Sequence, residues 1–134
     1  MALTALVTGV DFVSLPTQDL ERATTFYAGV LGLEAGPVWG RDGTPAMGAE
    51  FETGTVTLAV MATEAFGMGF GANRNPIALH VEDYHAARAE LESRGVTFTS
   101  DTIDSGVCLM ASFDDPAGNV LMIHHRYAPR AEAA

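Results

Sequence analysis

The chain contains an internal repeat whose period is close to half its length. The pentapeptides Asp19–Ala23 and Asp83–Ala87 each follow a short β-rich run, and each opens a helical pattern that ends in glycine. Asp19 and Asp83 are 64 residues apart in a chain of 134. A repeat of this size predicts two copies of one structural unit rather than a longer array. Two half-sheets related by a pseudo-twofold axis would place a cavity between them, which suits a small-molecule site.

Both copies are predicted to run through the same order of elements, βαβββ, which indicates an α+β fold. An aspartate caps each helix, because its carboxylate accepts from N–H groups of the first turn. Gly32 and Gly95 allow the left-handed conformation that ends a helix. In the first copy we expect a strand at 10–17, a helix at 19–32 and strands at about 33–41, 46–53 and 55–62. In the second copy we expect a strand at 76–82, a helix at 83–95 and strands at about 96–103, 106–114 and 119–126.

The chain is predicted to be one domain made of two modules. The expected parts are module one at about 9–63, a glycine-rich connector at about 64–75, module two at about 76–127 and a frayed tail at 128–134. In the connector, glycines alternate with Phe66, Met68 and Phe70, which suits neither a good helix nor a regular strand. The connector is either a plain linker or a mobile flap whose apolar side chains touch a ligand.

The charge balance limits the classes of partner. Seventeen acidic residues stand against seven arginines and no lysine, so the net charge is −10. Such a surface repels phosphate backbones, which argues against nucleic acid as a partner, and it attracts cationic ligands over long range. The same charge also serves ordinary solubility, so it leaves the charge of a ligand open.

Other segments argue against further classes. No apolar run approaches the roughly 18 residues of a membrane-spanning helix. The segment Met1–Val7 lacks the basic region of a signal peptide, so a cytoplasmic protein is expected. Cys108 is the only cysteine, which rules out an internal disulfide and a cysteine-based zinc site. Its apolar neighbours predict a buried, unreactive thiol.

Two groups of motifs carry a resemblance to a known family. They are Phe12–Pro16, Asp19–Ala23, Phe26-Tyr27 and Leu31–Leu33, and, near the end, Phe113-x-Asp115-Pro116-x-Gly118-Asn119. Over residues 9–126 the chain resembles the vicinal oxygen chelate superfamily, which includes glyoxalase I, extradiol dioxygenases, fosfomycin-resistance enzymes and bleomycin-resistance proteins. The resemblance implies two tandem βαβββ modules whose mixed, curved sheets form a half-open barrel around a cavity. It leaves the reaction open, because one scaffold carries several chemistries and some pure binders.

In enzymes of that superfamily, histidine and glutamate side chains on the first and last strands of the modules hold a divalent metal. Carried over by position, these sites fall on Phe12, Leu58, Pro76 and Met122. Three of these side chains are hydrocarbon and the fourth is a soft thioether, so none can ligate a hard or borderline divalent ion. This departure predicts that the family's metal site is absent and that the protein uses no cofactor.

Strand alternation predicts which polar groups share the cavity, because side chains two positions apart point to the same face. His80 and His124 are the two titratable groups that this rule places inside, and both are candidate catalytic residues. His125 is expected to face away, and His85 to lie on the exposed side of the second helix. A neutral imidazole can hydrogen-bond a ligand or move a proton near neutral pH. Either histidine can equally be held at the sheet rim by backbone or water.

The predicted ligand-binding set combines the cavity face with aromatic and sulfur side chains. Trp39, the sole tryptophan, can stack on a planar or cationic ligand, or can simply pack in the core. Methionines add soft, adaptable wall, although they also fill gaps in cores. The full set is Phe12, Ser14, Trp39, Met47, Leu58, Ala78, His80, Met110, Met122 and His124.

Three functions are compatible with these residues. The leading one is a metal-free binder of a small apolar, aromatic or cationic compound such as an antibiotic, similar to bleomycin-resistance proteins. The second is an enzyme of lyase, isomerase or dioxygenase type. It would use His80 or His124 as general base, or both in a relocated metal site with Glu50 or Glu52. The third is a protein with a degenerate pocket that works through a dimer surface. The resemblance implies a homodimer.

Overall fold

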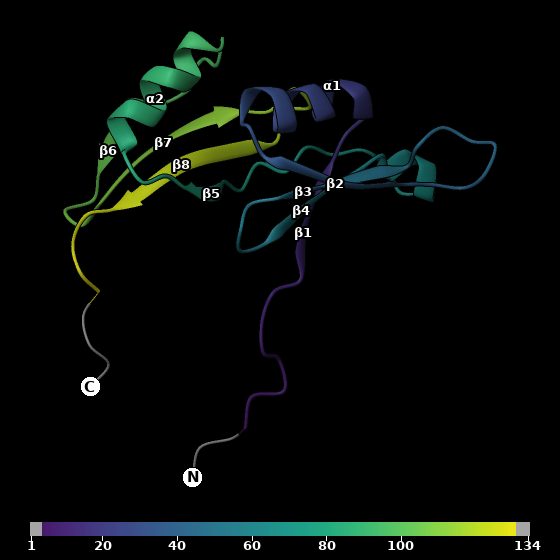
Figure 1. The fold of residues 1–134 in the computed structure, drawn as a ribbon, viewed down its shortest axis with the longest axis horizontal. Coiled ribbons are helices and arrows are strands. Elements are labelled where there is room, and N and C mark those ends of the chain that lie inside the picture. The colour runs from purple at the N-terminus through teal and green to yellow at the C-terminus, as the bar shows by residue number, and fades with distance from the viewer. Residues whose placement is uncertain (1–3, 131–134) are drawn as a thin grey trace.

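The computed structural model describes residues 4–130, which form two βαβββ modules (Figure 1). Module one contains β1 (Phe12–Pro16), α1 (Leu20–Thr24), the π-helix η1 (Thr25–Val30), β2 (Glu34–Trp39), β3 (Gly48–Glu52) and β4 (Thr57–Met61). The short 3₁₀ helix η2 (Thr63–Phe66) opens the connector. Module two contains β5 (Ile77–His80), α2 (Tyr84–Ser93), β6 (Ile103–Asp104), β7 (Cys108–Asp114) and β8 (Val120–Arg126). The predicted α+β order is confirmed.

Each module builds one mixed, four-stranded sheet. The strand orders are β1-β4-β3-β2 and β5-β8-β7-β6, with β1 parallel to β4 and β5 parallel to β8. The two sheets stay separate, and neither closes into a barrel within residues 4–130. Both modules carry their helices on the same side of the molecule (Figure 1). Neither α1, η1 nor α2 covers the opposite face of either sheet, and we call it the open face.

The two helices begin and end where the sequence predicts. The Asp19 carboxylate accepts from the Arg22 backbone N–H at 3.1 Å, and Asp83 caps α2 in the same way. Gly32 and Gly95 adopt φ angles of 73° and 93°, the left-handed region that ends a helix. The π-helical turn of the first helix was not predicted. The hydroxyls of Thr24 and Thr25 each donate to the backbone carbonyl four residues earlier. These hydrogen bonds compete with the regular helical ones.

The strand expected at 96–103 is wrong for most of its length. Only β6, two residues long, pairs with β7, and an isolated bridge joins Phe98 to Phe113. The Ser100 hydroxyl accepts from the Ser112 backbone N–H at 3.0 Å, a donor that a continuous strand would have paired with a carbonyl. A serine- and threonine-rich segment therefore replaces part of the ladder with side-chain hydrogen bonds.

The core lies between the sheets and their helices. Tyr27 from η1 stacks on Phe51 with ring centroids 5.4 Å apart. Phe26 lies 6.3 Å from Phe113 of the other module, so one helix packs against both sheets. Cys108 is buried, as predicted. Aromatic and aliphatic side chains from both modules are buried in one continuous cluster.

A buried polar network also joins the modules. The Tyr27 hydroxyl donates to Asp115 at 2.6 Å, and the Asn119 amide donates to the Pro16 carbonyl and to Asp115, each at 2.8 Å. Asn119 in turn accepts from the backbone N–H of Asn73 in the connector at 2.8 Å. Burial, together with the Asp115 carboxylate, raises the pKa of Tyr27 above its ordinary range. The Asp115–Asn119 turn is therefore a joint between β1, η1 and the connector.

The remaining expectations concern the ends and membranes. Within residues 4–130 no helix is long and apolar enough to cross a bilayer. Residues 128–130 carry no helix or strand, while 131–134 of the predicted tail and 1–3 of the N-terminus lie outside the described residues.

Candidate functional site

The open face of module two gathers the two predicted histidines. His80 of β5 lies directly opposite His124 of β8, and Met110 of β7 lies opposite His124 on the other side. Ala78 and Met122 form the next row of the same face. The alternate side chains point to the helices and are mostly buried, as in Leu121 and Ile123. The registers therefore place these predicted site residues on one surface, where their binding role stays a prediction.

The histidines differ in their surroundings. The His80 imidazole lies 3.0 Å from the Glu82 carboxylate, and both side chains are largely exposed. By alternation along β8, His125 lies on the helix side; its imidazole is 3.0 Å from the Val81 carbonyl, and its ring centroid is 6.2 Å from that of His80. His85 is exposed on α2, as predicted, with its ring edge-on to Tyr84.

Arg126 adds a cation to this open face and was missed by the sequence reasoning. It follows Met122 and His124 by the same alternation along β8, and it lies opposite Cys108. One guanidinium nitrogen is 3.9 Å from the Cys108 sulfur and another donates to the Pro129 carbonyl at 3.3 Å. Its Nε is buried without a hydrogen-bond partner among the described residues. The alternation that found the histidines would also have found Arg126.

The open face of module one is aromatic and acidic. Trp39 of β2 lies opposite Gly48 of β3, and its ring rests on the glycine: a Cβ there would sit 2.6 Å from the ring Cη2. Phe66 of η2 meets the indole edge-on, with centroids 5.6 Å apart. Glu50 lies two positions from Gly48 on the same face. It pairs with Ala59 of β4, which pairs in turn with Ser14 of β1. Gly48 therefore makes the space that holds the indole against the sheet.

Two predicted ligand-binding residues are on the wrong face. Leu58 pairs with Val13 and Phe51 in the helix-side core and is buried, so it cannot share a surface with Ser14. Met47 directly precedes Gly48, so it points to the helix side, where it is also buried. It lines a hollow of about 500 Å³ together with Gln18, Leu20, Arg41, Pro45 and other residues. Phe12, by contrast, is exposed on the open face of β1.

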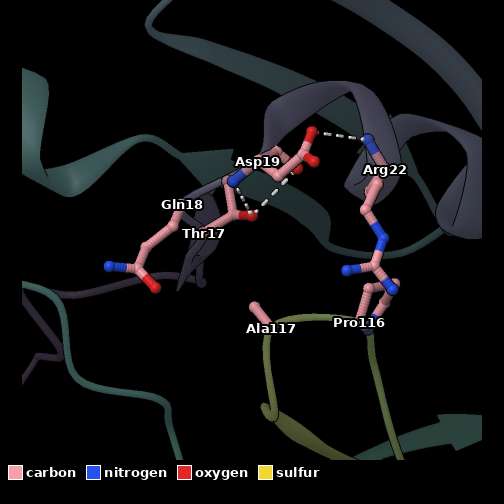
Figure 2. A pocket seen from close by; sticks show the side chains of 6 residues that line it. All are labelled: Thr17, Gln18, Asp19, Arg22, Pro116 and Ala117. Carbon is pink, nitrogen blue, oxygen red and sulfur yellow. Dashed lines mark hydrogen bonds between the residues drawn. The ribbon is translucent and has the colours of Figure 1, made fainter.

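The single chain has hollows beside its helices. Figure 2 shows one of about 150 Å³ between the start of α1 and the β7–β8 turn, lined by Thr17, Gln18, Asp19, Arg22, Pro116 and Ala117. Its Asp19 and Thr17 are engaged in capping α1, so much of its polar lining already serves the fold. A larger hollow of about 350 Å³ lies between η1 and the segment after α2. Neither hollow is lined by His80, His124 or Trp39.

Comparison with known families decides the identity of this fold. The model of the Glyoxalase/Bleomycin resistance protein/Dioxygenase superfamily matches residues 9–123. The chain belongs to this superfamily. The glyoxalase-superfamily resemblance drawn from the motifs is therefore confirmed. No curated protein sequence matches the chain.

Solved structures share the fold at low sequence identity. An antibiotic-binding protein from a Streptomyces species superposes with a TM-score of 0.77 at 22% identity, covering 92% of this chain and 99% of that one. A lactoylglutathione lyase from Agrobacterium tumefaciens gives 0.73 at 18% identity, covering 88% and 93%. A superfamily member from Sphaerobacter thermophilus gives 0.72 at 24% identity, covering 90% and 98%. Binders and enzymes are thus equally compatible with the fold.

The residues present do not fit the metal that glyoxalase-superfamily enzymes hold. The strand registers show that the residue of β4 equivalent to Met122 is Ala59, because Ala59 pairs with Ser14 as Met122 pairs with Ala78. Alanine ligates no metal, and neither does Leu58, the residue that the spacing of the repeat predicted at this position. No three histidine, cysteine or acidic side chains come together among residues 4–130. A relocated site that joins His80 and His124 to Glu50 or Glu52 is therefore not assembled within one chain, where Glu52 accepts from Thr57 at 2.9 Å.

Proposed function

We propose that this glyoxalase-superfamily protein is a metal-free small-molecule-binding protein, and that its ligand lies against the open faces of the sheets. The observation that carries the proposal is the Trp39 ring seated on Gly48, with Phe66 at its edge. A large aromatic side chain fixed at a helix-free sheet surface suits the stacking of a flat ligand. The likeness in fold to an antibiotic-binding protein supports the same class of function.

The chemistry of the open faces favours a planar aromatic ligand that carries a positive charge. Glu50 lies on the same face as Trp39, and the net charge of −10 draws cations toward the protein. An indole face attracts a cation through its π-electrons. In module two, His80 and His124 would supply hydrogen bonds to the polar rim of the same ligand. Antibiotics with fused aromatic rings and an amino group match this description.

We propose further that a homodimer completes the site. A ligand pocket normally buries most of its ligand, but neither His80 nor Trp39 lines the hollows described beside the helices of one chain. A second copy lying over the open faces would enclose them. The molar mass in solution, measured by light scattering after size exclusion, is expected to be twice the 14.1 kDa of one chain. A mass of one chain at all concentrations would contradict this arrangement.

A histidine-dependent enzyme is the second candidate function, favoured by one observation. His80 and His124 are direct cross-strand partners on the open face of module two, and the His80 ring also lies 6.2 Å from the ring of His125. One neutral imidazole can take a proton from a bound substrate while the other orients it. Turnover of a carbonyl or ring compound that disappears in both His80→Ala and His124→Ala would favour this function over simple binding.

The binding proposal is tested by a thermal-shift screen of planar aromatic cations, with uncharged analogues of the same ring systems alongside. We expect at least one cation to raise the melting temperature of the wild-type protein, because a ligand that binds only the folded state stabilises it. The same compound should shift Trp39→Ala much less and Trp39→Phe to an intermediate extent. Equal shifts in the wild-type protein and Trp39→Ala would contradict the proposed place of binding.

A further inference from the structure

A hollow of about 500 Å³ lies on the helix side of module one, behind the sheet surface that carries Trp39. It is bounded by the beginning of α1, the β2–β3 loop and the segment that leads from β4 into η2. It is larger than the other hollows described above, and its volume falls within the roughly 300–1,000 Å³ of small-molecule pockets. The open-face binding proposed above makes no use of it.

Most of the lining of this hollow is apolar. Leu20, Pro45, Met47 and Ala62 contribute side chains without a charge or a hydrogen-bond donor, and Met47 is only 7% exposed. The unbranched thioether of methionine adapts its shape to different neighbours. The hollow therefore suits the compact apolar body of a small molecule.

The polar side chains of the lining are engaged within the fold, with one exception. The Asp19 carboxylate caps α1, and the Thr44 hydroxyl donates to a carbonyl of its own loop at 2.7 Å. The Gln18 amide donates to Glu64 at 3.1 Å. The exposed Arg41 guanidinium has no hydrogen bond or ion pair with any residue of the described range 4–130. Among the lining residues, Arg41 is thus the uncommitted charge, and its exposure places it at the mouth of the hollow.

We propose that this hollow is a second small-molecule site, which binds a monocarboxylic acid with a compact apolar body. The body lies against Leu20 and Met47, and the carboxylate pairs with Arg41. A guanidinium holds a carboxylate through two parallel N–H···O hydrogen bonds, which give the pair both strength and direction. The net charge of −10, together with Asp19 in the lining, disfavours a ligand with more than one negative charge. The site is separate from the open faces, so the inference does not rest on the function proposed for them.

Two backbone hydrogen bonds at the hollow provide a local readout of binding. The Met47 N–H donates to the Trp39 carbonyl at 2.8 Å, and the Ala62 N–H donates to the Met47 carbonyl at 2.9 Å. A ligand against Met47 changes the surroundings of both amides. Their NMR resonances therefore respond to an occupied hollow, whereas those of β8 in the other module do not.

The test is an NMR titration of the full chain with octanoate, with octanamide and acetate in parallel. Octanamide keeps the apolar body but loses the charge, whereas acetate keeps the charge but loses the body. The octanoate titration is repeated with Arg41→Gln and Arg41→Lys. Arg22→Gln and Arg126→Gln are the matched controls, because Arg22 lines another hollow and Arg126 lies on the open face of module two.

We expect octanoate to shift the Met47 and Ala62 amides. Arg41→Gln should raise the dissociation constant at least about tenfold, because a charge-assisted pair is lost. Arg41→Lys should give an intermediate value, since an ammonium pairs with a carboxylate as a point charge. Arg22→Gln and Arg126→Gln should leave the constant within about twofold of the wild-type value. Octanamide and acetate should each bind at least about tenfold more weakly than octanoate.

Several results would overturn the inference. Octanoate that shifts no amide of the hollow would reject the site. Binding that is lost in Arg126→Gln would place the acid on the open face of module two instead. Equal affinities for acetate and octanoate would show an adventitious ion only, and equal affinities of the wild-type chain and Arg41→Gln would show that Arg41 does not recognise the carboxylate. None of these results bears on the planar cation, whose binding is measured through Trp39 fluorescence.

Discussion

The two open faces occupy equivalent places in two copies of one unit, yet their chemistry differs. Module one presents an indole on a glycine beside a carboxylate, whereas module two presents paired imidazoles, methionines and a guanidinium. The helix-side faces of both sheets, in contrast, keep the same kind of aliphatic and aromatic packing. The difference shows that the two modules share the packing of the core, while their open faces would offer a ligand different chemistry.

The strongest test of the shared core is the joint at Asn119. This fully buried side chain satisfies the Pro16 carbonyl, the Asn73 N–H and Asp115. Asn119→Ala leaves these groups unpaired, so we expect the free energy of unfolding to fall by about 3 kcal/mol or more. Urea denaturation measures it. The control is Asp114→Ala, which removes only an exposed ion pair with Arg74 and should cost less than about 1 kcal/mol.

Tyr27 makes the same joint sensitive to alkaline pH. Its pKa is raised in the folded state by burial and by Asp115, while the unfolded chain has a tyrosine pKa of about 10. The unfolded chain therefore loses this proton first, so the tyrosine's contribution to stability is complete below about pH 10 and declines above it. We expect Tyr27→Phe to lower stability at pH 7 by about 1–3 kcal/mol and to flatten the decline above pH 10. Parallel curves for the two proteins between pH 9 and 11 would contradict this assignment.

Gly48→Ala tests the role of the open face of module one in ligand binding. The added Cβ overlaps the Trp39 ring, so the indole must leave the sheet, at a cost in stability of about 1–3 kcal/mol. We expect the affinity for a ligand found in the screen to fall at least about tenfold, as it would if the platform were removed. Gly69→Ala is the matched control, because a Cβ there meets no atom within 4 Å. Unchanged affinity in Gly48→Ala would mean that Trp39 is not the binding surface.

His124→Ala tests whether the ligand also uses module two. The loss of one hydrogen bond is expected to weaken binding by about three- to tenfold, a smaller effect than that of Gly48→Ala. Isothermal titration calorimetry measures both variants, with the exposed His85→Ala on α2 as control. If the affinities of His124→Ala and His85→Ala agree, the ligand contacts module one alone.

The repeat in the sequence predicted the modules, the helix caps and the buried Cys108, because each of these depends on local patterns. The repeat gave a wrong correspondence between β4 and β8, because the two copies differ in length by one residue. The segment from β1 to β4 is one residue longer than the segment from β5 to β8, so the spacing of 64 between the two copies falls to 63 in the last strand of each. Met122 therefore corresponds to Ala59 and not to Leu58. A shift of one residue moves a strand's side chain to the opposite face, which explains the error at Leu58.

Other parts of the site depend on contacts between distant segments. The turn at Asp115–Asn119 was visible in the sequence, but its buried partners Tyr27 and Pro16 come from module one. The seating of Trp39 on Gly48 likewise depends on the pairing of β2 with β3, which no local pattern reveals. The sequence identified the indole and the two histidines as candidates, and strand pairing shows that the histidines share one sheet face while Trp39 lies on the other sheet.

Trp39 is the sole tryptophan of the chain, so its fluorescence reports directly on the proposed site. The most direct measurement is a fluorescence titration of the wild-type protein and Gly48→Ala with the planar aromatic cation found in the screen, corrected for the ligand's own absorption. We predict saturable quenching in the wild-type protein and a binding curve shifted at least about tenfold in Gly48→Ala. A ligand that stabilises the protein but leaves the Trp39 emission unchanged would contradict the account, because it would bind away from the open face of module one.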